Sequence, residues 1–559
     1  MKKRTLIIAI AAVLLVGAAV ACFFIFGGNN NRHNTNAKPM DDMVAFYINV
    51  DQLVEKSAIN NIITDANRSL IATVLASELD DPKGAEYIKS VMSDLSNTGI
   101  NTKKPIYGYA NTMETLIGLN FEVILVAEVA DAAKIDRTLA LAEEVTGMNM
   151  EVEHKGKMRT LPLGDDCIIG YNDSRFILSI TSDNSAHKVS KKAFDRETPD
   201  LGAYAKYDIA YSANLIKVLD LACKSIESDI DEDMEYLMMC EYEYEKEWVA
   251  ENITNMEQQL KTIKQFKDNF TDDSNAIMGL SFEKGRIVAE AIINGYNSEY
   301  ELNKKVSNDY LKYVSKDAIA VMNMAVNGSM LSKMVSDFAT TEYAELLGIG
   351  RGEFNIYMGI LCDALKSING DVTIALEDIN GNLYYGTQSV DALLAIDADD
   401  DYIISNIAQF GEGLLEKRGK NSYGFEFDVF DFTIGQTDEA LYLTVNSDFK
   451  QQSSPATKSA WYTDMKNSYG YLVLDIDNLM DNSLVASSYR SFMRQMDKSF
   501  AETTTSFIDS CSYAYINATT PNSAQMVLVF DDRNTNALEQ ITRQVVPAAI
   551  RTATNDMFR

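Results

Sequence analysis

Four stretches of the chain share one pattern, in which a short apolar strand is followed by Asn or Asp and then by a helical run. They are Val44–Lys56 (VAFYINVDQLVEK), Asp208–Leu219 (DIAYSANLIKVL), Ala318–Leu331 (AIAVMNMAVNGSML) and Tyr469–Met480 (YGYLVLDIDNLM). Side chains in the strand part alternate with a period of two, and the helical run that follows begins with apolar residues. The pattern predicts a chain built from strand-into-helix units, and it describes architecture rather than chemistry.

Other features recur at a near-constant spacing, which predicts a tandem duplication. The hairpin Ile168–Ile180 (IIGYNDSRFILSI) returns as Thr433–Val445 (TIGQTDEALYLTV), so that Gly170 and Gly435 stand 265 residues apart. We therefore expect an α+β protein of two similar tandem halves, residues 43–307 and residues 308–559. Each half would be an antiparallel sheet with helices packed on one face.

The N-terminus predicts attachment to a membrane. Lys2-Lys3-Arg4 precede the apolar run Thr5–Phe26, whose 22 residues can span a hydrocarbon core of roughly 30 Å. Since basic residues stay on the cytoplasmic side, the rest of the chain would lie outside the cytoplasm, in the cell envelope. Residues 1–26 are thus a membrane anchor or signal, and the Asn/Gly-rich residues 27–42 are predicted to be a flexible tether.

Cys22 allows a second interpretation of this segment. The sequence Ala19-Val20-Ala21-Cys22 resembles a bacterial lipobox, which makes Cys22 a candidate for lipidation. The residues after Cys22 are Phe-Phe-Ile-Phe rather than polar, and the apolar run is longer than that of a typical cleaved signal, both of which favour an uncleaved single-pass helix. Both interpretations hold the body of the protein at a membrane.

A long helical insert, residues 215–270, distinguishes the first half from the second. Its apolar residues fall at three- and four-residue spacing, and the acidic run Asp229–Glu235 is the expected corner between two helices. The hairpin would be either a lid on the sheet of its own half or an arm that binds a partner. We favour the lid.

Composition excludes several classes of function. The net charge is −31, with 50 Lys and Arg against 81 Asp and Glu, and no basic stripe follows the N-terminus, so nucleic acid is not an expected partner. The six cysteines form no CxxC or Cys/His cluster, and free thiols are expected outside the N-terminal segment. His154 and His187 lie in polar stretches, which disfavours a histidine general base.

Motifs that could carry chemistry have simpler explanations. The loop Gly348–Gly352 (GIGRG) does not follow a strand, so we interpret it as a helix-terminating turn rather than a phosphate loop. The acidic run Asp397–Asp401 lacks the Gly and Glu of a calcium-binding loop, and like Asp131 and Asp475 it is expected to cap a helix. The sequence therefore predicts no catalytic, cofactor-binding or metal-binding residue.

Phe46–Ser57 (FYINVDQLVEKS), Val126–Lys134 (VAEVADAAK) and the hairpin Ile168–Ile180 together resemble a domain-of-unknown-function family. The resemblance covers residues 43–550. Its members are exported, often lipid-anchored envelope proteins of Bacteroides-type bacteria. The resemblance implies location in the envelope, and it implies no activity and no catalytic residue.

These observations favour a membrane-tethered, non-enzymatic binding or assembly module without a cofactor. Its partners would be the membrane, through the N-terminal segment, and possibly another envelope protein. Two alternatives remain open: a carboxylate-dependent hydrolase of glycan or peptide, and a self-associating structural component of the cell surface.

Overall fold

The computed structural model describes most of the chain after the N-terminal segment. The described residues are 38–69, 82–115, 118–146, 151–155, 158–164, 166–182, 186–240, 242–296, 304–338, 351–382, 387–398, 401–410, 415–427, 429–496 and 498–557. The predicted anchor, Cys22 and most of the predicted tether lie outside these residues. Among the described helices, none is long and apolar enough to cross a membrane.

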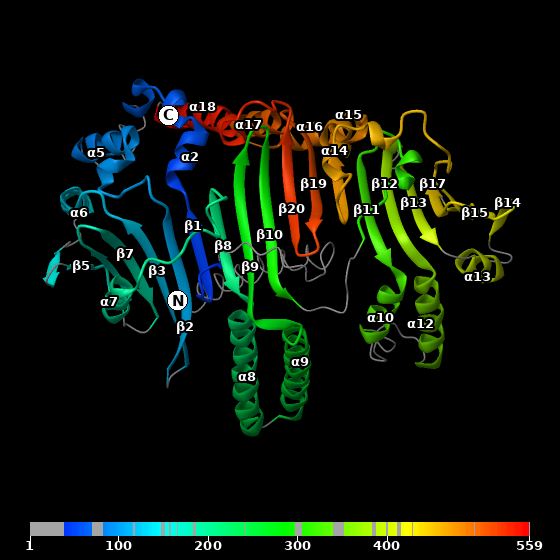
Figure 1. The fold of residues 1–559 in the computed structure, drawn as a ribbon, viewed down its shortest axis with the longest axis horizontal. Helices are drawn as coiled ribbons and strands as arrows, with labels where there is room; N and C mark the ends of the chain where they lie inside the picture. Colours follow the sequence, from blue (N-terminus) through cyan, green and yellow to red (C-terminus); the bar gives the residue numbers. More distant parts are fainter. Residues whose placement is uncertain are drawn as a thin grey trace. The chain divides into compact units, whose positions relative to one another are not determined.

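The chain divides into two compact units. The larger unit comprises Arg32–Asn297 together with Arg533–Arg559, and the smaller unit comprises Ser298–Asp532. Each unit combines helices with an antiparallel sheet (Figure 1).

Within the described residues, the larger unit has ten strands. They are β1 (Val44–Ile48), β2 (Ile106–Thr115), β3 (Gly118–Glu128), β4 (Glu153–Lys155), β5 (Met158–Pro162), β6 (Cys167–Tyr171), β7 (Arg175–Thr181), β8 (Ile209–Asn214), β9 (Phe270–Glu283) and β10 (Arg286–Tyr296). Its helices are α2 (Val50–Ser57), α3 (Ile59–Ile62), α5 (Pro82–Ser93), η1 (Leu95–Thr98), α6 (Ala132–Thr146), α7 (Ala186–Asp195), α8 (Leu215–Met239), α9 (Glu243–Lys267) and α18 (Ala537–Met557).

The described part of the smaller unit also has ten strands. They are β11 (Ala320–Asn327), β12 (Ile368–Asn382), β13 (Thr387–Ala398), β14 (Glu416–Gly419), β15 (Ser422–Phe427), β16 (Phe430–Gln436), β17 (Leu441–Val445), β18 (Gly470–Asp475), β19 (Cys511–Thr520) and β20 (Ser523–Phe530). Its helices are η2 (Asp309–Lys312), α10 (Gly328–Phe338), α12 (Arg351–Lys366), α13 (Tyr402–Phe410), η3 (Ala456–Lys458), α14 (Tyr462–Met465), α15 (Ile476–Asp481), α16 (Ser483–Met493) and α17 (Lys498–Ile508).

The two sheets have the same strand order. In the larger unit the order is β4-β5-β6-β7-β3-β2-β1-β8-β9-β10, and every neighbouring pair is antiparallel. In the smaller unit the order is β14-β15-β16-β17-β13-β12-β11-β18-β19-β20, again antiparallel throughout. Each strand of one sheet thus occupies the place of the strand numbered ten higher in the other.

All four predicted strand-into-helix units form, and the Asn or Asp between strand and helix has the same role in each. Its side-chain oxygen accepts a hydrogen bond from the backbone N–H three residues later. The residues and donor–acceptor distances are Asn49 at 3.2 Å, Asn214 at 3.0 Å, Asn327 at 3.1 Å and Asp475 at 3.0 Å. Because this bond satisfies one of the free N–H groups of the first helical turn, it favours the change from strand to helix at that residue.

Helices cover the sheets differently from the prediction. Helix α7 packs on β3, β6 and β7, as expected for a helix on a face of a sheet. Strands β1 and β8 are antiparallel neighbours, so α2 and α8, which follow them without a connecting loop, leave from opposite ends of the sheet (Figure 1). These two helices extend the strands instead of returning to a common face.

Two predicted boundaries differ in the structure. The C-terminal helix α18 does not belong with the rest of residues 308–559, because it packs on α2, α3, β9 and β10 of the larger unit. Asn536, just before α18, donates its side-chain amide to the carbonyl of Phe282 at 2.9 Å. The predicted tether, residues 27–42, ends too late, since Met40 and Asp42 are only 6% and 5% exposed.

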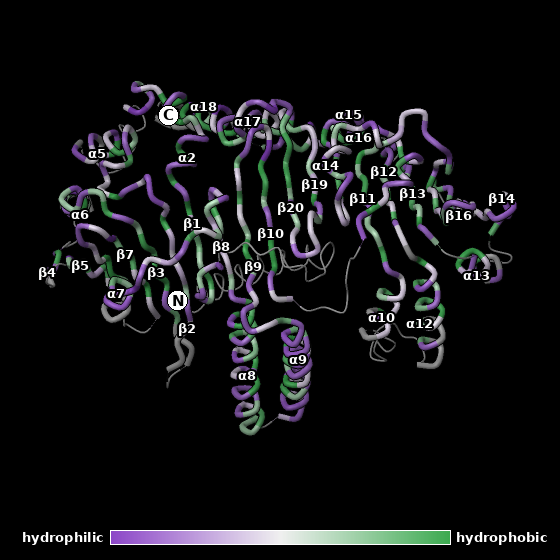
Figure 2. Tube along the Cα trace, viewed as in Figure 1, coloured by the Kyte–Doolittle hydropathy of each residue, from purple (hydrophilic) through white to green (hydrophobic). Residues whose placement is uncertain are grey.

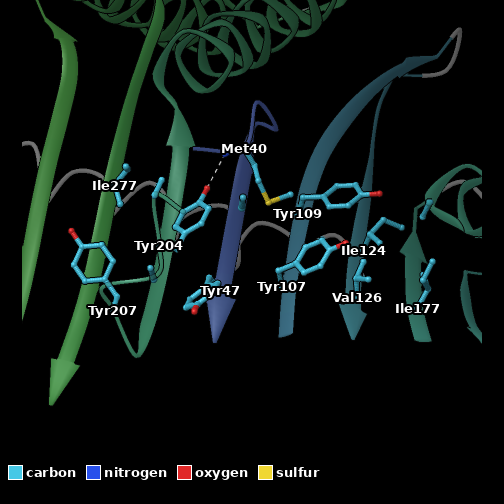
Figure 3. Packing of buried hydrophobic residues seen from close by; sticks show 14 residues of the cluster. Met40, Tyr47, Tyr107, Tyr109, Ile124, Val126, Ile177, Tyr204, Tyr207 and Ile277 are labelled. Atoms are coloured by element: carbon cyan, nitrogen blue, oxygen red, sulfur yellow. Dashed lines mark hydrogen bonds between the residues drawn. The ribbon is translucent and has the colours of Figure 1, made fainter. Parts of the chain in front are cut away.

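The core of the larger unit includes a layer of tyrosines on β1, β2 and the chain before β8 (Figure 3). The rings of Tyr47 and Tyr204 are stacked with their centroids 5.8 Å apart. The Tyr204 hydroxyl accepts a hydrogen bond from the backbone N–H of Met40 at 3.0 Å and lies 2.7 Å from the Ser212 hydroxyl. The buried tyrosines therefore also hold the segment that precedes β1 against the sheet.

Candidate functional site

The α8–α9 hairpin stands away from its sheet. At its base α8 packs on β8 and β9, and beyond the ends of these strands the two helices pack on each other (Figure 1). Ile230, Val249 and Ile253 form a buried cluster between them, and Asn252 donates a hydrogen bond to Asp233 at 2.6 Å. The lid that we favoured from the sequence is therefore not the arrangement observed.

The corner of the hairpin also differs from the prediction. Helix α8 continues through the acidic run 229–235 and ends at Met239, and α9 begins at Glu243. The run stays helical because Ile230 is buried against α9 while its acidic neighbours can remain in solvent. The turn between the helices thus lies among the residues after Met239.

The free end of the hairpin carries large hydrophobic side chains in solvent. Among the residues whose side chains the structure describes, 21 large hydrophobic residues are exposed, and seven of them lie within 15 residues at this end. They are Met234, Tyr236, Met238, Met239, Tyr242, Tyr244 and Trp248, and we call them the hairpin tip. Figure 2 shows hydrophobic residues reaching this end of α8. Such a concentration on a surface is typical of a site that contacts another molecule.

The two tryptophans of the chain illustrate how unusual the hairpin tip is. Trp461 is 1% exposed, whereas Trp248 is 65% exposed. Tyr244 and Trp248 are four residues apart, so they are neighbours on the surface of α9. The rings of Tyr242 and Tyr244 lie 5.9 Å apart.

Acidic residues surround the hairpin tip. Residues 229–251 include ten Asp or Glu and a single basic residue, Lys246. Glu243 and Glu245 lie in the first turn of α9, where a negative charge also suits the helix dipole. The hairpin tip is therefore an apolar surface within a strongly negative field.

The smaller unit has helices at the corresponding place, between β18 and β19, and the junction of α16 and α17 has an excess of basic residues. Residues 490–500, at the junction of α16 and α17, include the exposed Phe492, Met496 and Phe500. Arg490, Arg494 and Lys498 are exposed in the same segment. We call residues 490–500 the basic corner.

A second candidate site is a pocket of about 640 Å³ in the larger unit. We call it the Arg196 pocket. It is lined by residues from the segment before β1, from β2 and β3, and from the C-terminal end of α7 and the residue after it: Asp42, Tyr109, Asn111, Glu122, Lys191, Lys192, Ala193, Asp195 and Arg196. Pockets of this size accommodate small organic ligands.

The wall of the Arg196 pocket is held by an ion pair. Arg196 binds both oxygens of the Asp42 carboxylate, with N–O distances of 2.9 and 2.7 Å, and its guanidinium lies 4.1 Å from the centre of the Tyr109 ring. Hydrogen bonding to Asp42 raises the pKa of Arg196, so the guanidinium stays charged. Burial raises the pKa of Tyr109, so its hydroxyl stays neutral at physiological pH.

Arg175 fixes the end of α7 that contributes to this wall. One guanidinium nitrogen of Arg175 donates to the backbone carbonyls of Ala193, Phe194 and Arg196, at 3.2, 3.1 and 2.7 Å. A cation at a helix C-terminus satisfies the last carbonyl groups and suits the helix dipole. The position of Arg196 is thereby set by β7 as well as by Asp42.

Asn111 connects the acids at the back of the Arg196 pocket. Its side-chain oxygen accepts the backbone N–H of Met43 at 2.9 Å, and its amide donates to Asp42 at 2.8 Å and to Glu122 at 3.5 Å. Glu122 is 4% exposed, and its other carboxylate oxygen, Oε2, has no hydrogen-bond partner in the structure. Asn111 and Glu122 face each other across β2 and β3.

Asp42 is not placed for acid–base catalysis. Both oxygens of Asp42 are bonded to Arg196, so Asp42 is not available to exchange a proton with a substrate. Within the described residues, no group of three or more His, Cys, Asp or Glu is placed to hold a metal ion.

Outcomes for the other predicted residues are mixed. Cys22 and Gly348–Gly350 lie outside the described residues, and α12 begins at Arg351. Asp131 and Asp475 cap helices, as predicted, since each accepts a hydrogen bond from a backbone N–H at the start of the following helix. Five cysteines are free thiols, as predicted: Cys167, Cys223, Cys240, Cys362 and Cys511.

The residues of the Arg196 pocket were not identified from the sequence. A usable signal was present in β2, where Tyr107, Tyr109 and Asn111 alternate on one face, so that a polar residue takes an apolar place. Glu122 interrupts the corresponding face of β3, which continues with Ile124. A polar residue among the core-facing residues of a strand indicates either a buried hydrogen-bond network or a ligand-binding site.

Comparison with known protein families identifies the family of this chain. A family model described as "Domain of unknown function (DUF4836)" matches residues 34–538. The chain belongs to this family. The match confirms the predicted resemblance to a domain-of-unknown-function family, whereas bacterial origin, export and lipid anchoring stay predictions. The comparisons found no match among curated proteins and none among solved structures.

Proposed function

We propose that this member of the DUF4836 family is a membrane-tethered, non-enzymatic binding module that docks onto a partner protein through the hairpin tip. The observation that carries the proposal is the set of seven exposed Met, Tyr and Trp side chains at the end of the α8–α9 hairpin. Aromatic residues and Met are enriched in the cores of protein interfaces, and Met adapts its shape to a partner surface.

The tether follows from the N-terminal sequence. Residues 1–26 combine three basic residues with the 22-residue apolar run Thr5–Phe26, which supports an anchor that leaves the folded units in the cell envelope. A module fixed at a membrane meets membrane-bound partners at an increased effective concentration, so moderate affinity for a partner would suffice.

Charge defines the partner further. The ten acidic residues in 229–251 disfavour anionic lipid and nucleic acid, and they favour a protein surface with an apolar centre and a rim of Lys and Arg. Surface charges are screened over about 8 Å at physiological ionic strength. We therefore expect added salt to lower the association rate constant and to change the dissociation rate constant little.

The test is a crosslinking pull-down of tagged, full-length protein from its native membranes, read by mass spectrometry. Tyr244→Ser combined with Trp248→Ser should abolish recovery of the partner. Phe427→Ser is the matched control, because Phe427 is 69% exposed on β15 and lies far along the chain from the hairpin. Equal recovery of the partner by the tip variant and by wild type would contradict the proposal.

A second candidate function is self-association, and the basic corner favours it. The exposed Phe492 and Phe500 with Arg490 and Arg494 form an apolar surface with basic neighbours, which complements the hairpin tip of a second copy. A contact between two different surfaces of the same chain extends head to tail unless rotation closes a ring. This candidate corresponds to a self-associating surface component.

Charge reversal distinguishes a second copy from a different partner. Arg490→Glu with Arg494→Glu should remove self-association in sedimentation velocity, and so should Glu243→Lys with Glu245→Lys. Mixing the two variants should restore association, because the reversed tip then meets the reversed corner and the unchanged tip meets the unchanged corner. A wild-type protein that sediments as a monomer at every concentration would exclude self-association and leave the first candidate.

We further propose that the two units arose by tandem duplication. The shared strand order and the four capped strand-into-helix units support it. Sequence profiles of the two units, built from family members, should align with each other strand for strand. Profiles that align no better than those of unrelated sheets would contradict a duplication.

A further inference from the structure

The Arg196 pocket contains a buried carboxylate that the protein leaves incompletely bonded. Glu122 is 4% exposed, its Oε1 receives a single long hydrogen bond of 3.5 Å from Asn111, and its Oε2 receives none. Burying a carboxylate oxygen without a donor costs free energy, and nearly all such groups in folded proteins have a partner. Oε2 has less than 1 Å² of accessible surface, so a donor from outside the protein would complete this site once the Glu122 side chain turns toward the pocket that it lines.

The two charged residues next to Glu122 at the back of the Arg196 pocket, Asp42 and Arg196, are already paired with each other. Asp42 and Arg196 neutralise each other through two hydrogen bonds, and the remaining Asp42 contact comes from Asn111. The charge of Arg196 is therefore already balanced by Asp42, and Glu122 is the acid at this end without a cation. The group that fits best beside Glu122 Oε2 is a cationic donor such as a primary ammonium.

The α7 side of the Arg196 pocket favours an anionic group, in contrast to the cationic group favoured beside Glu122. Lys191 and Lys192 line it and are exposed, and neither makes an ion pair with another described residue. Asp195 is the one acid that lines the pocket on this side. Two lysines against one aspartate favour an anionic group here.

We propose that the Arg196 pocket binds a short zwitterion of the size of a di- or tripeptide. Its ammonium group would donate to Glu122 Oε2, and its carboxylate would lie near Lys191 and Lys192. The volume of about 640 Å³ leaves space for such a ligand, and the Tyr109 ring supplies an apolar wall for its backbone. This site is independent of the hairpin tip and does not rest on the proposed function.

Glycine peptides test both ends of the ligand. Calorimetry with the full-length protein should detect triglycine, whereas N-acetyl-triglycine, which lacks the ammonium, should bind at least about tenfold more weakly, as expected for loss of a charge-assisted hydrogen bond. Triglycine amide, which lacks the carboxylate, should also bind more weakly, by a smaller factor because the lysines are exposed.

Variants connect each end to its residue. Glu122→Gln should remove the difference between triglycine and N-acetyl-triglycine, and Lys191→Met with Lys192→Met should remove the difference between triglycine and its amide. Glu283→Gln, at the end of β9, is the matched control and should bind like wild type. Tyr244→Ser with Trp248→Ser should also bind all three peptides normally, which separates this proposal from docking by the hairpin.

The peptide comparison keeps the proposal open to contradiction even if Glu122→Gln fails to fold. Wild-type protein that binds none of the peptides, or that binds triglycine and N-acetyl-triglycine equally, would overturn it. A difference between the peptides that survives in correctly folded Glu122→Gln protein would place the ammonium elsewhere, and would overturn the assignment to this pocket.

Discussion

The helices between β8 and β9 and those between β18 and β19 occupy the same place in the same strand order, yet they differ in size and surface. In the larger unit, α8 and α9 have 25 residues each and end in an acidic, aromatic tip. In the smaller unit, α15, α16 and α17 have 6, 11 and 11 residues and carry basic side chains at their corner. The sheet tolerates either insert because the strands take their hydrogen bonds from neighbouring strands and not from the helices.

The largest expected difference concerns the two tryptophans. Trp461→Ala should destabilise the smaller unit by about 3–5 kcal/mol, because it leaves a cavity beside Tyr471. Trp248→Ala should change stability by no more than about 0.5 kcal/mol, because the side chain is already in solvent. Urea unfolding followed by far-UV circular dichroism measures both. Comparable losses for the two variants would show that the hairpin tip is covered within the protein.

A change inside the hairpin should separate it from its sheet. Ile253→Ala removes part of the buried cluster with Ile230 and Val249, and a cost of about 2–4 kcal/mol is expected. Because this cluster joins only α8 and α9, hydrogen exchange should accelerate in both helices while β8 and β9 stay protected. Met238→Ala, at the exposed tip, is the control and should leave exchange unchanged. Equal acceleration in β9 would mean that hairpin and sheet unfold together.

Removal of a helix cap should lower stability by a smaller amount, and the same substitution can be made in both units. Asn214→Ala and Asn327→Ala should each cost about 1 kcal/mol, since each removes one hydrogen bond to the start of a helix. Asn327→Asp should retain most of the stability, because a carboxylate also accepts the bond, whereas Asn214→Asp also loses the amide hydrogen bond that Asn214 donates to Asp41. Thermal unfolding measures the difference. An unchanged midpoint in both Ala variants would show that helix packing alone sets the boundary between strand and helix.

The smallest effects concern two acids whose pKa values shift in opposite directions. Burial raises the pKa of Glu377 in the smaller unit, so its contribution to stability is greatest at low pH and is lost as pH rises through the folded-state pKa. Hydrogen bonding to Lys217 lowers the pKa of Asp41 in the larger unit, so its contribution is present at neutral pH and is lost as pH falls.

Glu377→Gln should therefore stabilise the protein at pH 7 and have no effect once Glu377 is protonated. Asp41→Asn should weaken the protein slightly at pH 7 and have no effect in acid. The urea midpoint of each variant relative to wild type, measured from pH 7 into acid, gives the pH dependence of each effect. If this difference changed in the same direction with pH for both variants, the assigned environments of the two carboxylates would be contradicted.

Local features of the fold followed from the sequence. The period-two strands, the capping Asn and Asp residues and the hairpin around Asn172 depend on neighbours within a few residues, so their patterns are readable in the chain itself. The free cysteines were predictable for a similar reason, since no spacing among them suggested a disulfide framework.

Contacts between distant segments were not predictable. The α8–α9 turn lies after Met239 and not in the acidic run, because burial of Ile230 against α9 outweighs the preference of charged residues for a corner. The Arg196 pocket combines Asp42, Asn111, Glu122 and Arg196, which lie up to 154 positions apart in the sequence. Each of these side chains looks like an ordinary polar surface residue until its partners are known.

The sequence by itself determined the strand-into-helix units and their caps, because short-range hydrogen bonding and hydrophobic periodicity decide them. Only the tertiary structure decided the order of strands in each sheet, the membership of α18 in the larger unit, the exposure of Trp248 and the environment of Glu122. These properties depend on which distant surfaces exclude water from one another, and that choice is made by the whole chain.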